Sequence, residues 1–463
     1  MVARLDFHRA QCTRRRFLMT RFLGRIRGTT TLLLILFAGA ACDTSSTLPG
    51  NDPELDGILE REVTLNGLRP LSAFILPDET DLAALPQDPQ NPLTPEKVAL
   101  GKLLFHETGL ATNPLHPASA GTYSCATCHH ADAGFQAGRQ QAIADGGIGW
   151  GQRGEGRRPN PAYAARDLDV QPLRSPSALN SGYQRVIMWS GNLGANGVNA
   201  QFTGPWPEDS GESANYLGYD GLESQAIAGL RAHRMNRFEE SPLATNSTYQ
   251  ALWQQVWPGQ DIARERVGLT IAAYERTLVA NHAPWQRWLR GDVGAMTDAE
   301  KRGAILYFGK ANCSDCHTGP ALSQMAFYSL GMPDMPGIDA SGAGARGRGS
   351  FTGRESDDFT FKVPQLYNLA DSPFYGHGGT FSSLEEVVEY YNMGIPAKGL
   401  PDGRVTQQFH PLQLTHDEVA DLVAFLRGAL RDPDLDRYVP EILPSGNCFP
   451  ANDPEARRDL GCD

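Results

Sequence analysis

Apolar residues recur at helical spacing in four stretches of the chain, and strand-like alternation of apolar and polar residues is nearly absent. The four stretches are 94–105, 262–279, 297–308 and 415–426. Apolar positions three or four residues apart lie on one face of a helix. The pattern therefore predicts a mostly α fold.

Three of these stretches also open with residues that begin helices. The predicted starts are Thr94 before Pro95 and the capping-box pairs Thr297 with Glu300 and Thr415 with Glu418. In the remaining stretch, 262–279, the positions expected to face inward are Val267, Ile271, Tyr274 and Leu278.

Length and composition bound the architecture. The 463 residues are 41% hydrophobic and 20% charged, which suits one large or two ordinary domains and excludes general disorder. No apolar run is long enough for a multi-span membrane protein. The 49 glycines and 32 prolines predict many turns and long irregular loops between the helices.

The first 41 residues have the pattern of an export signal. Residues 4–27 carry eight arginines, and the apolar run Leu32–Phe37 precedes small residues up to Cys42. This order is typical of a secretory signal peptide. Gly39–Cys42 fits a lipoprotein cleavage box that would leave a lipid on Cys42, while Ala38–Ala40 fits ordinary cleavage. We expect a protein of the periplasm or outer cell envelope, with that lipid as its only membrane attachment.

The chain is acidic. Its formal net charge is −12, which argues against nucleic acid as a partner. Residues 1–41 hold eight arginines and one aspartate, so their removal leaves −19 on residues 42–463. This charge would serve solubility alone, or it would steer a basic protein partner toward the surface.

Two C-x-x-C-H motifs carry the strongest chemical signal. They are Cys125-Ala-Thr-Cys128-His129 and Cys313-Ser-Asp-Cys316-His317. Two thiols at this spacing can add to the two vinyl groups of a haem, and the adjacent histidine then reaches the iron as proximal ligand. Zinc would need further Cys or His pairs nearby, and a redox dithiol would need neither the repeat nor the histidine. The chain is therefore predicted to carry two covalently bound haem c groups.

The sequence around these motifs resembles the superfamily of bacterial diheme cytochrome c peroxidases and MauG, from about residue 92 to residue 430. The stretches that carry the resemblance are Leu100–Phe105, Pro176–Asn180, Val186–Gly191, Gln225–Ala226, Ala273–Leu278, Phe361–Asn368, Phe374–Gly378 and Ser383–Val388. The resemblance implies two cytochrome c-like haem domains in tandem. The expected parts are a signal peptide (1–41), an N-terminal linker segment (42–88), a peroxidatic haem domain (89–284), an electron-transfer haem domain (285–435) and a tail (436–463).

The resemblance also implies a division of labour between the haems. The haem on His129 would react with hydrogen peroxide through a ferryl intermediate, and the haem on His317 would receive electrons from a small cytochrome c or cupredoxin. On the far side of the second haem, the peroxidases carry a methionine and MauG-type enzymes a tyrosine. The alignment puts Tyr391 at that ligand position, with Met393 as the competitor. A phenolate stabilises ferric and higher-valent iron, whereas a thioether favours ferrous iron.

Peroxidases of the superfamily carry a histidine after the first motif that blocks the peroxidatic iron until activation. Residues 131–204 contain no histidine, and His130 adjoins the proximal ligand, so we expect a sixth position that is open or holds water. His106 and His116 are the remaining candidate blockers. Trp189 matches the tryptophan that lies between the haems in the superfamily and would relay electrons there; its other reading is core packing.

Cleavage of the peroxide O–O bond needs a group that moves a proton from the inner to the outer oxygen. The superfamily places a glutamine and, about ten residues later, a glutamate on this side. Gln225 fits the glutamine, but residues 232–236 hold no carboxylate. We expect His233 to act as the base, unless it only lies on a helix face. The other candidates are Arg234, as an anion stabiliser, and Glu239 or Glu240, folding back.

Two features lie outside the haem sites. The superfamily often binds calcium between its haem domains through an asparagine just before the Pro-x-x-Leu-Asn stretch; Arg174 falls at about that position, so calcium is not assigned. Cys448 and Cys462 frame the tail and are predicted to form a disulfide. The enlarged segment between Trp189 and Gln225 is rich in Gly, Asn and Pro, and forms either a surface loop or a partner surface.

The leading hypothesis is a diheme peroxidase that reduces hydrogen peroxide to water. The first alternative is MauG-like oxidation of aromatic side chains in a partner protein, which Tyr391, the missing blocking histidine and the missing glutamate favour. The second alternative is a diheme electron carrier without catalytic activity.

Overall fold

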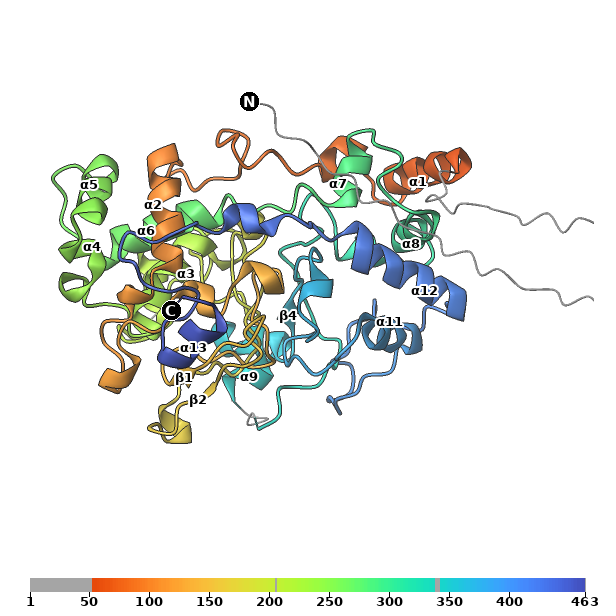
Figure 1. Ribbon diagram of the computed structural model, residues 1–463. Coiled ribbons are helices and arrows are strands. Elements are labelled where there is room, and N and C mark those ends of the chain that lie inside the picture. The colour runs from red at the N-terminus through yellow and green to blue at the C-terminus, as the bar shows by residue number, and fades with distance from the viewer. Residues whose placement is uncertain (1–51, 205, 338–341, 463) are drawn as a thin grey trace, which may run out of the picture. The chain divides into compact units, whose positions relative to one another are not determined.

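The computed structural model describes residues 52–204, 206–337 and 342–462, and the fold there is mostly helical with long loops (Figure 1). The predicted signal peptide and Cys42 lie outside these residues. The helices are α1 (Pro53–Leu65), α2 (Pro95–His106), α3 (Gly221–Ala232), α4 (Pro242–Thr245), α5 (Ser247–Val256), α6 (Arg264–Glu275), α7 (Pro284–Leu289), α8 (Asp298–Phe308), α9 (Ala343–Arg346), α10 (Arg348–Thr352), α11 (Leu384–Met393), α12 (His416–Ala424) and α13 (Pro454–Asp459). The strands form two short antiparallel pairs, β1 (Gly147–Ile148) with β2 (Arg158–Pro159) and β3 (Phe327–Tyr328) with β4 (Phe361–Lys362). The prediction of a mostly α fold is confirmed.

The predicted helix starts are confirmed as well. The Thr94 side chain accepts from the Lys97 N–H at the start of α2, and both predicted capping boxes form at α8 and α12. The stretch 262–279 folds as α6, which ends at Glu275. Its four predicted inward residues are all buried. These outcomes follow from local sequence, because a cap satisfies backbone groups within one turn of itself.

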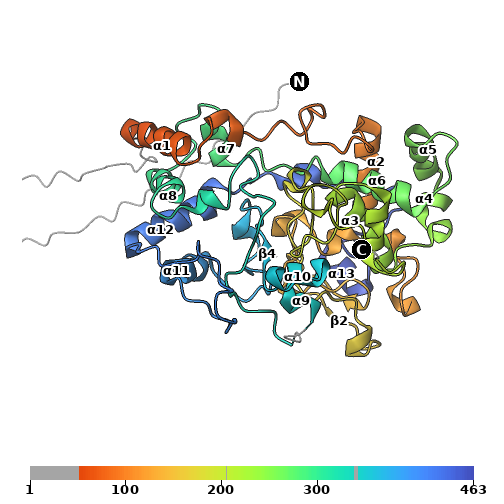
Figure 2. The same ribbon diagram turned by 180° about the vertical axis from the view of Figure 1, so that it is seen from behind.

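One hydrophobic core joins the C-terminal helices to the beginning of the chain. Trp285 of α7, Phe308 of α8 and Phe425 at the end of α12 pack with ring centroids 5.7–5.8 Å apart. Leu59 and Val63 of α1 are fully buried in this cluster. Figures 1 and 2 both show α1 beside α8, although the two helices are far apart in the sequence.

Polar contacts fix α1 at that place. Asp56 of α1 accepts a hydrogen bond from Trp288 Nε1 at 2.7 Å and forms an ion pair of 2.8 Å with Lys301 of α8. Since the pair is buried, loss of one partner would leave an uncompensated charge in the core. Part of the segment expected as a linker is therefore packed into the C-terminal half.

A second core is built from α2, α3, α5 and α6. Helices α2 and α6 cross closely at Gly101, where a Cβ atom would lie only 2.1 Å from the carbonyl oxygen of Thr270. Glycine is thus required for the contact. Leu104 and Ile271 are buried at this crossing, and the same cluster includes the partly buried Cys125 and Cys128.

The C-terminal tail returns to this N-terminal half. Cys448 and Cys462 form a disulfide, as predicted. Ala456 of α13 packs with Trp150, and the Asp459 carboxylate accepts from the Trp150 N–H at 2.8 Å. The beginning of the described chain therefore packs against the C-terminal half, and its end packs against the N-terminal half. The domain boundaries stay a prediction. Among the described residues, no helix is long and apolar enough to cross a membrane.

Candidate functional site: two C-x-x-C-H motifs and the cavity beside the second

The two C-x-x-C-H motifs adopt the same backbone conformation. Each begins with a 3₁₀ turn, Cys125–Thr127 in the first and Cys313–Asp315 in the second. The histidine N–H donates to the carbonyl of the first cysteine at 3.0 Å in one motif and 2.9 Å in the other. This repeat folds each pair of thiols and its histidine into one compact unit, as attachment to a single haem requires.

Both motif histidines are prepared for metal ligation through Nε2. Nδ1 of His129 lies 3.3 Å from the Phe135 carbonyl oxygen, and Nδ1 of His317 lies 3.0 Å from that of Pro364. A hydrogen bond from Nδ1–H to a carbonyl fixes the tautomer that leaves Nε2 as the free electron pair. Burial lowers the pKa of both imidazoles to about 4, so each is neutral at physiological pH.

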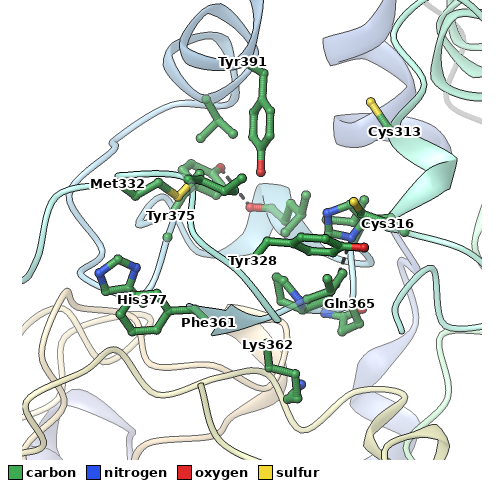
Figure 3. Close-up of a pocket in the computed structure, with 18 of the residues that line it drawn as sticks. Cys313, Cys316, Tyr328, Met332, Phe361, Lys362, Gln365, Tyr375, His377 and Tyr391 are labelled. Atoms are coloured by element: carbon green, nitrogen blue, oxygen red, sulfur yellow. Dashed lines mark hydrogen bonds between the residues drawn. The ribbon is translucent and has the colours of Figure 1, made fainter. Parts of the chain in front are cut away.

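A cavity of about 650 Å³ lies against the second motif (Figure 3). Its wall includes Cys313, Cys316, His317 and Tyr391, together with many apolar side chains. The volume is in the range of cofactor pockets. A group with two thioether links, a nitrogen ligand and an apolar surround therefore fits this place.

The cavity distinguishes between the two candidate ligands opposite His317. The Tyr391 hydroxyl points from α11 into the cavity (Figure 3), and its ring packs against Tyr390 and Phe409. Met393, two residues on, is 53% exposed and does not line the cavity. Burial beside the Cys313 and Cys316 thiols raises the pKa of Tyr391. Met332, which the sequence did not single out, lies on the wall away from the two cysteines (Figure 3).

Trp189 lies between the two motifs. Its side chain lines the cavity of the second motif, while the preceding Met188 packs in the cluster that holds Cys125 and Cys128. Met188 also lines this cavity, and its backbone is left-handed, with φ of 74°. The indole Nε1–H donates to the Arg174 carbonyl at 2.8 Å.

His377 and Phe361 form the other side of the Trp189 environment. Their rings stack with centroids 3.7 Å apart and 9° between planes, and Trp189 meets His377 edge-on at 6.3 Å. The next residue, Lys362, donates its backbone N–H to the Trp189 carbonyl at 2.8 Å. Burial lowers the pKa of the Lys362 ammonium to about 7. The stretches that hold these residues, Phe361–Asn368 and Phe374–Gly378, were noticed in the sequence only through the resemblance.

The structure brings Gln225 and His233 together at the end of α3. A Cβ atom on Gly229 would lie 3.4 Å from Nε2 of Gln225 and 3.9 Å from Cδ2 of His233, so both side chains border the space that this glycine leaves. Nδ1 of His233 lies 2.8 Å from an oxygen of Asp169. Asp169 was missed because it stands 64 residues earlier in the chain, in a loop with no local pattern.

The pKa of His233 is raised above its ordinary value. Burial by itself lowers it, but the charge of Asp169 and the hydrogen bond to that carboxylate outweigh burial. With Nδ1–H donated to Asp169, Nε2 is the atom left to accept a proton. This His–Asp pair can therefore perform the proton transfer for which the sequence offered no carboxylate.

The neighbouring polar residues hold this pair in place. Arg234, in left-handed conformation with φ of 57°, forms a 2.8 Å ion pair with the fully buried Asp145. The Tyr123 hydroxyl donates to the His233 carbonyl at 2.9 Å. Arg234 is thus engaged by a carboxylate. Glu239 and Glu240 are exposed at the surface, which argues against their folding back.

The remaining histidines of the N-terminal half have other surroundings. His106 is buried with Nδ1 2.8 Å from the Lys102 carbonyl, and His116 packs on Tyr163 at 4.5 Å. His130 is buried edge-on against Trp150 at 4.8 Å. Their neighbours support the expectation that none of them blocks the peroxidatic site, which stays a prediction.

Two C-x-x-C-H motifs, an internal cavity beside the second of them and a His–Asp pair are the features expected of diheme c-type oxidoreductases. The sequence pattern of the di-haem cytochrome c peroxidase family matches residues 95–294. Cytochrome-c peroxidase IdrP1 of Denitromonas iodatirespirans is 29% identical over 370 residues, which cover 74% of this chain and 84% of that protein. Methylamine utilization protein MauG of Methylorubrum extorquens is 28% identical over 368 residues, covering 77% and 87%.

Together these matches support the superfamily of diheme cytochrome c peroxidases and MauG for this chain, with haem c as the cofactor. It is a cytochrome c peroxidase-like oxidoreductase. A solved MauG-like protein associated with microbial copper homeostasis has a TM-score of 0.54 and 24% identity, covering 78% of this chain and 94% of that one. This likeness shows the shared fold.

Proposed function

We propose that the protein reduces hydrogen peroxide to water outside the cytoplasm, with electrons from a small cytochrome c or cupredoxin. The observation that carries the proposal is the His233–Asp169 pair beside Gln225. A diheme electron carrier would need no such acid–base pair. Two electrons and two protons convert one peroxide into two waters, and the pair supplies the proton transfer.

The chain's residues divide into attachment, proton transfer and electron transfer. Thioether links at Cys125 and Cys128, and at Cys313 and Cys316, would hold two haems with His129 and His317 as proximal ligands. When bound, haem supplies the iron at which peroxide is reduced and the second iron that takes up electrons.

Proton transfer falls to the α3 end. Nε2 of His233 takes the proton from the inner peroxide oxygen and returns it to the outer one, while Asp169 holds the imidazole. The Gln225 amide orients peroxide by hydrogen bonding. The Trp189 indole, between the two motifs, passes electrons singly from the second site to the first.

Rapid mixing of the purified diheme protein with one equivalent of peroxide tests the proposal. We expect fast oxidation without prior reduction, then return to the resting optical and EPR spectra within milliseconds to seconds of adding a reduced small cytochrome c. An unreactive protein would be an electron carrier. An oxidised state that persists with the donor present, and disappears with an aromatic donor, would instead support MauG-like oxidation of a protein partner, which the Tyr391 position favours.

An acidic groove marks the surface where we expect the donor to dock. It lies between α8, α11 and α12 and is lined by Val419 and Val423 and by Glu300, Glu385 and Glu389. Arg427, which pairs with Glu385 at 2.7 Å, also borders it. Tyr391, on the opposite face of α11, and Leu422 of α12 line the cavity. A donor here would stand one helix, about 10 Å, from the second haem site. Its complementary partner is a small basic redox protein.

Charge reversal in the groove tests this docking. Replacing Glu385 and Glu389 by lysine should lower the rate constant for reduction by a basic cytochrome c at least about tenfold at low salt, because attraction becomes repulsion, with the difference fading at high salt. The matched control replaces the exposed Glu96 and Asp261 of the N-terminal half by lysine. Equal slowing by both pairs would mean that only net charge matters and would contradict the groove.

A further inference from the structure

The joint between the two halves contains a buried arginine without a carboxylate. The term joint here means residues 137–140, Arg174 and residues 372–379. Arg174 is 2% exposed, and among the described residues no acidic side chain lies within ion-pair distance of it. Burial lowers the pKa of its guanidinium to about 10, so the group keeps its charge at neutral pH. Buried charges normally have a counter-charge, so this one needs another explanation.

The guanidinium is surrounded by neutral oxygens from both halves of the chain. It donates to the carbonyls of Arg139 at 2.8 Å, Gln140 at 3.3 Å and Ala137 at 3.0 Å. It also donates to the Ser372 hydroxyl, which in turn donates to the Ala137 carbonyl at 2.9 Å. Four of the five N–H groups are used, and the buried Nε–H has no partner among the described residues.

Carbonyl and hydroxyl oxygens that converge from separate segments are the ligands of a hard metal ion. Here the centre of the oxygen set is taken by a side chain. Gly379 keeps the space tight, since a Cβ atom there would lie 3.3 Å from Cδ of Arg174. The Phe374 ring, 5.2 Å from the guanidinium carbon, covers another side. Calcium, which the superfamily often binds between its haem domains, therefore does not fit here, because its place and its oxygens are occupied.

We propose that the joint is a cation site filled by the chain's own guanidinium, so that the protein holds its two haem sites together without calcium. The backbone of Arg174 links the site to His377 and Trp189. Its N–H donates to the His377 carbonyl at 2.9 Å, and its carbonyl accepts from the Trp189 indole at 2.8 Å. Fixing the guanidinium thus fixes the indole. Only this consequence for Trp189 rests on the proposed function; the cation site rests on the geometry.

The first experiment uses the wild-type diheme protein. After treatment with a chelator, we expect no stoichiometric calcium by elemental analysis, and no change in resting EPR spectrum or thermal unfolding on adding calcium or chelator. One tightly bound calcium whose removal alters the spectra would overturn the proposal. Neither readout involves peroxide, so failure here is distinguishable from failure of the proposed function.

The second experiment empties the site with Arg174→Ala. We expect the midpoint of thermal unfolding to fall by several degrees and the EPR spectrum to change, and millimolar guanidinium or calcium to restore most of both. The control, Arg348→Ala, removes another buried arginine, which donates to the Ser190 and Gly191 carbonyls and to Oδ1 of Asn199 between three phenylalanine rings. It shows whether a calcium response is specific to the Arg174 site.

Three results would refute the cation site. An Arg174→Ala variant that matches the wild type would show that no cation is needed. A variant restored by neither cation would show that the oxygens do not form such a site. Full restoration by Arg174→Met, which supplies length without charge, would show that volume alone is required.

Discussion

Replacing His233 by alanine should slow the reaction of the diheme protein with peroxide by on the order of a hundredfold or more, the usual effect of removing a general acid–base group. On the proposed mechanism, Nε2 of His233 is the proton acceptor beside Gln225, and the Asp169 carboxylate lies behind it, against Nδ1. Stopped-flow absorption under pseudo-first-order peroxide gives the rate constant. His282→Ala is the matched control, since His282 pairs with Asp434 at 3.1 Å on the surface.

The pH dependence separates a proton-transfer role from a structural one. His233 accepts a proton only when neutral, so the rate should fall as the pH drops through its pKa. The Asp169 carboxylate raises that pKa; in Asp169→Asn the pKa should fall, and the acid limb of the profile should move to lower pH. The rate at high pH should fall less than in His233→Ala. An unchanged profile, or an unslowed His233→Ala, would remove the pair from the mechanism.

Replacing Tyr391 by methionine should raise the reduction potential of the C-terminal haem by on the order of a few hundred millivolts. A phenolate stabilises ferric iron, whereas a thioether stabilises ferrous iron, and axial ligands set haem potentials over most of a volt. Spectroelectrochemical titration gives the potential, and the oxidised variant should gain the far-red charge-transfer band of methionine ligation. The oxidised state formed with peroxide should also become shorter-lived.

Two further variants decide the ligand. Tyr391→Phe removes the hydroxyl that points into the cavity and should leave an open or water-held sixth position, seen as a high-spin signal by EPR. Met393→Leu should change neither potential nor spectrum, because Met393 is 53% exposed. A methionine band in the wild-type protein, or its loss in Met393→Leu, would show that the tyrosine assignment is wrong.

The haem motifs and the Tyr391 ligand position could be predicted from the sequence to different extents. The cysteines and histidines of the two motifs could be identified directly, because two thioether bonds and one axial ligand must all come from five consecutive residues. The helix starts at Thr94, Thr297 and Thr415 were equally local. Tyr391 needed more, since the sequence left Met393 as competitor until the cavity showed which side chain points inward.

Asp169 and Arg174 mark where sequence reasoning ended. Asp169 lies 64 residues before His233, and Ser372 lies 198 residues after Arg174. Nothing in either local pattern announces its partner. The sequence could show that a glutamate was missing and that a calcium ligand was replaced. It could not show which carboxylate pairs with His233 or which oxygens surround Arg174.

The amino-acid sequence by itself determined the haem motifs, the helical class and the helix ends, because covalent spacing and capping act within a few residues. Only the tertiary structure decided that α1 belongs to the C-terminal core, that the tail returns to Trp150, and that His233 and Arg174 find their oxygens in distant loops. Those contacts depend on how the two helical cores close on each other. Burial then makes each unpaired polar group costly, and so selects the partners that the folded chain brings near.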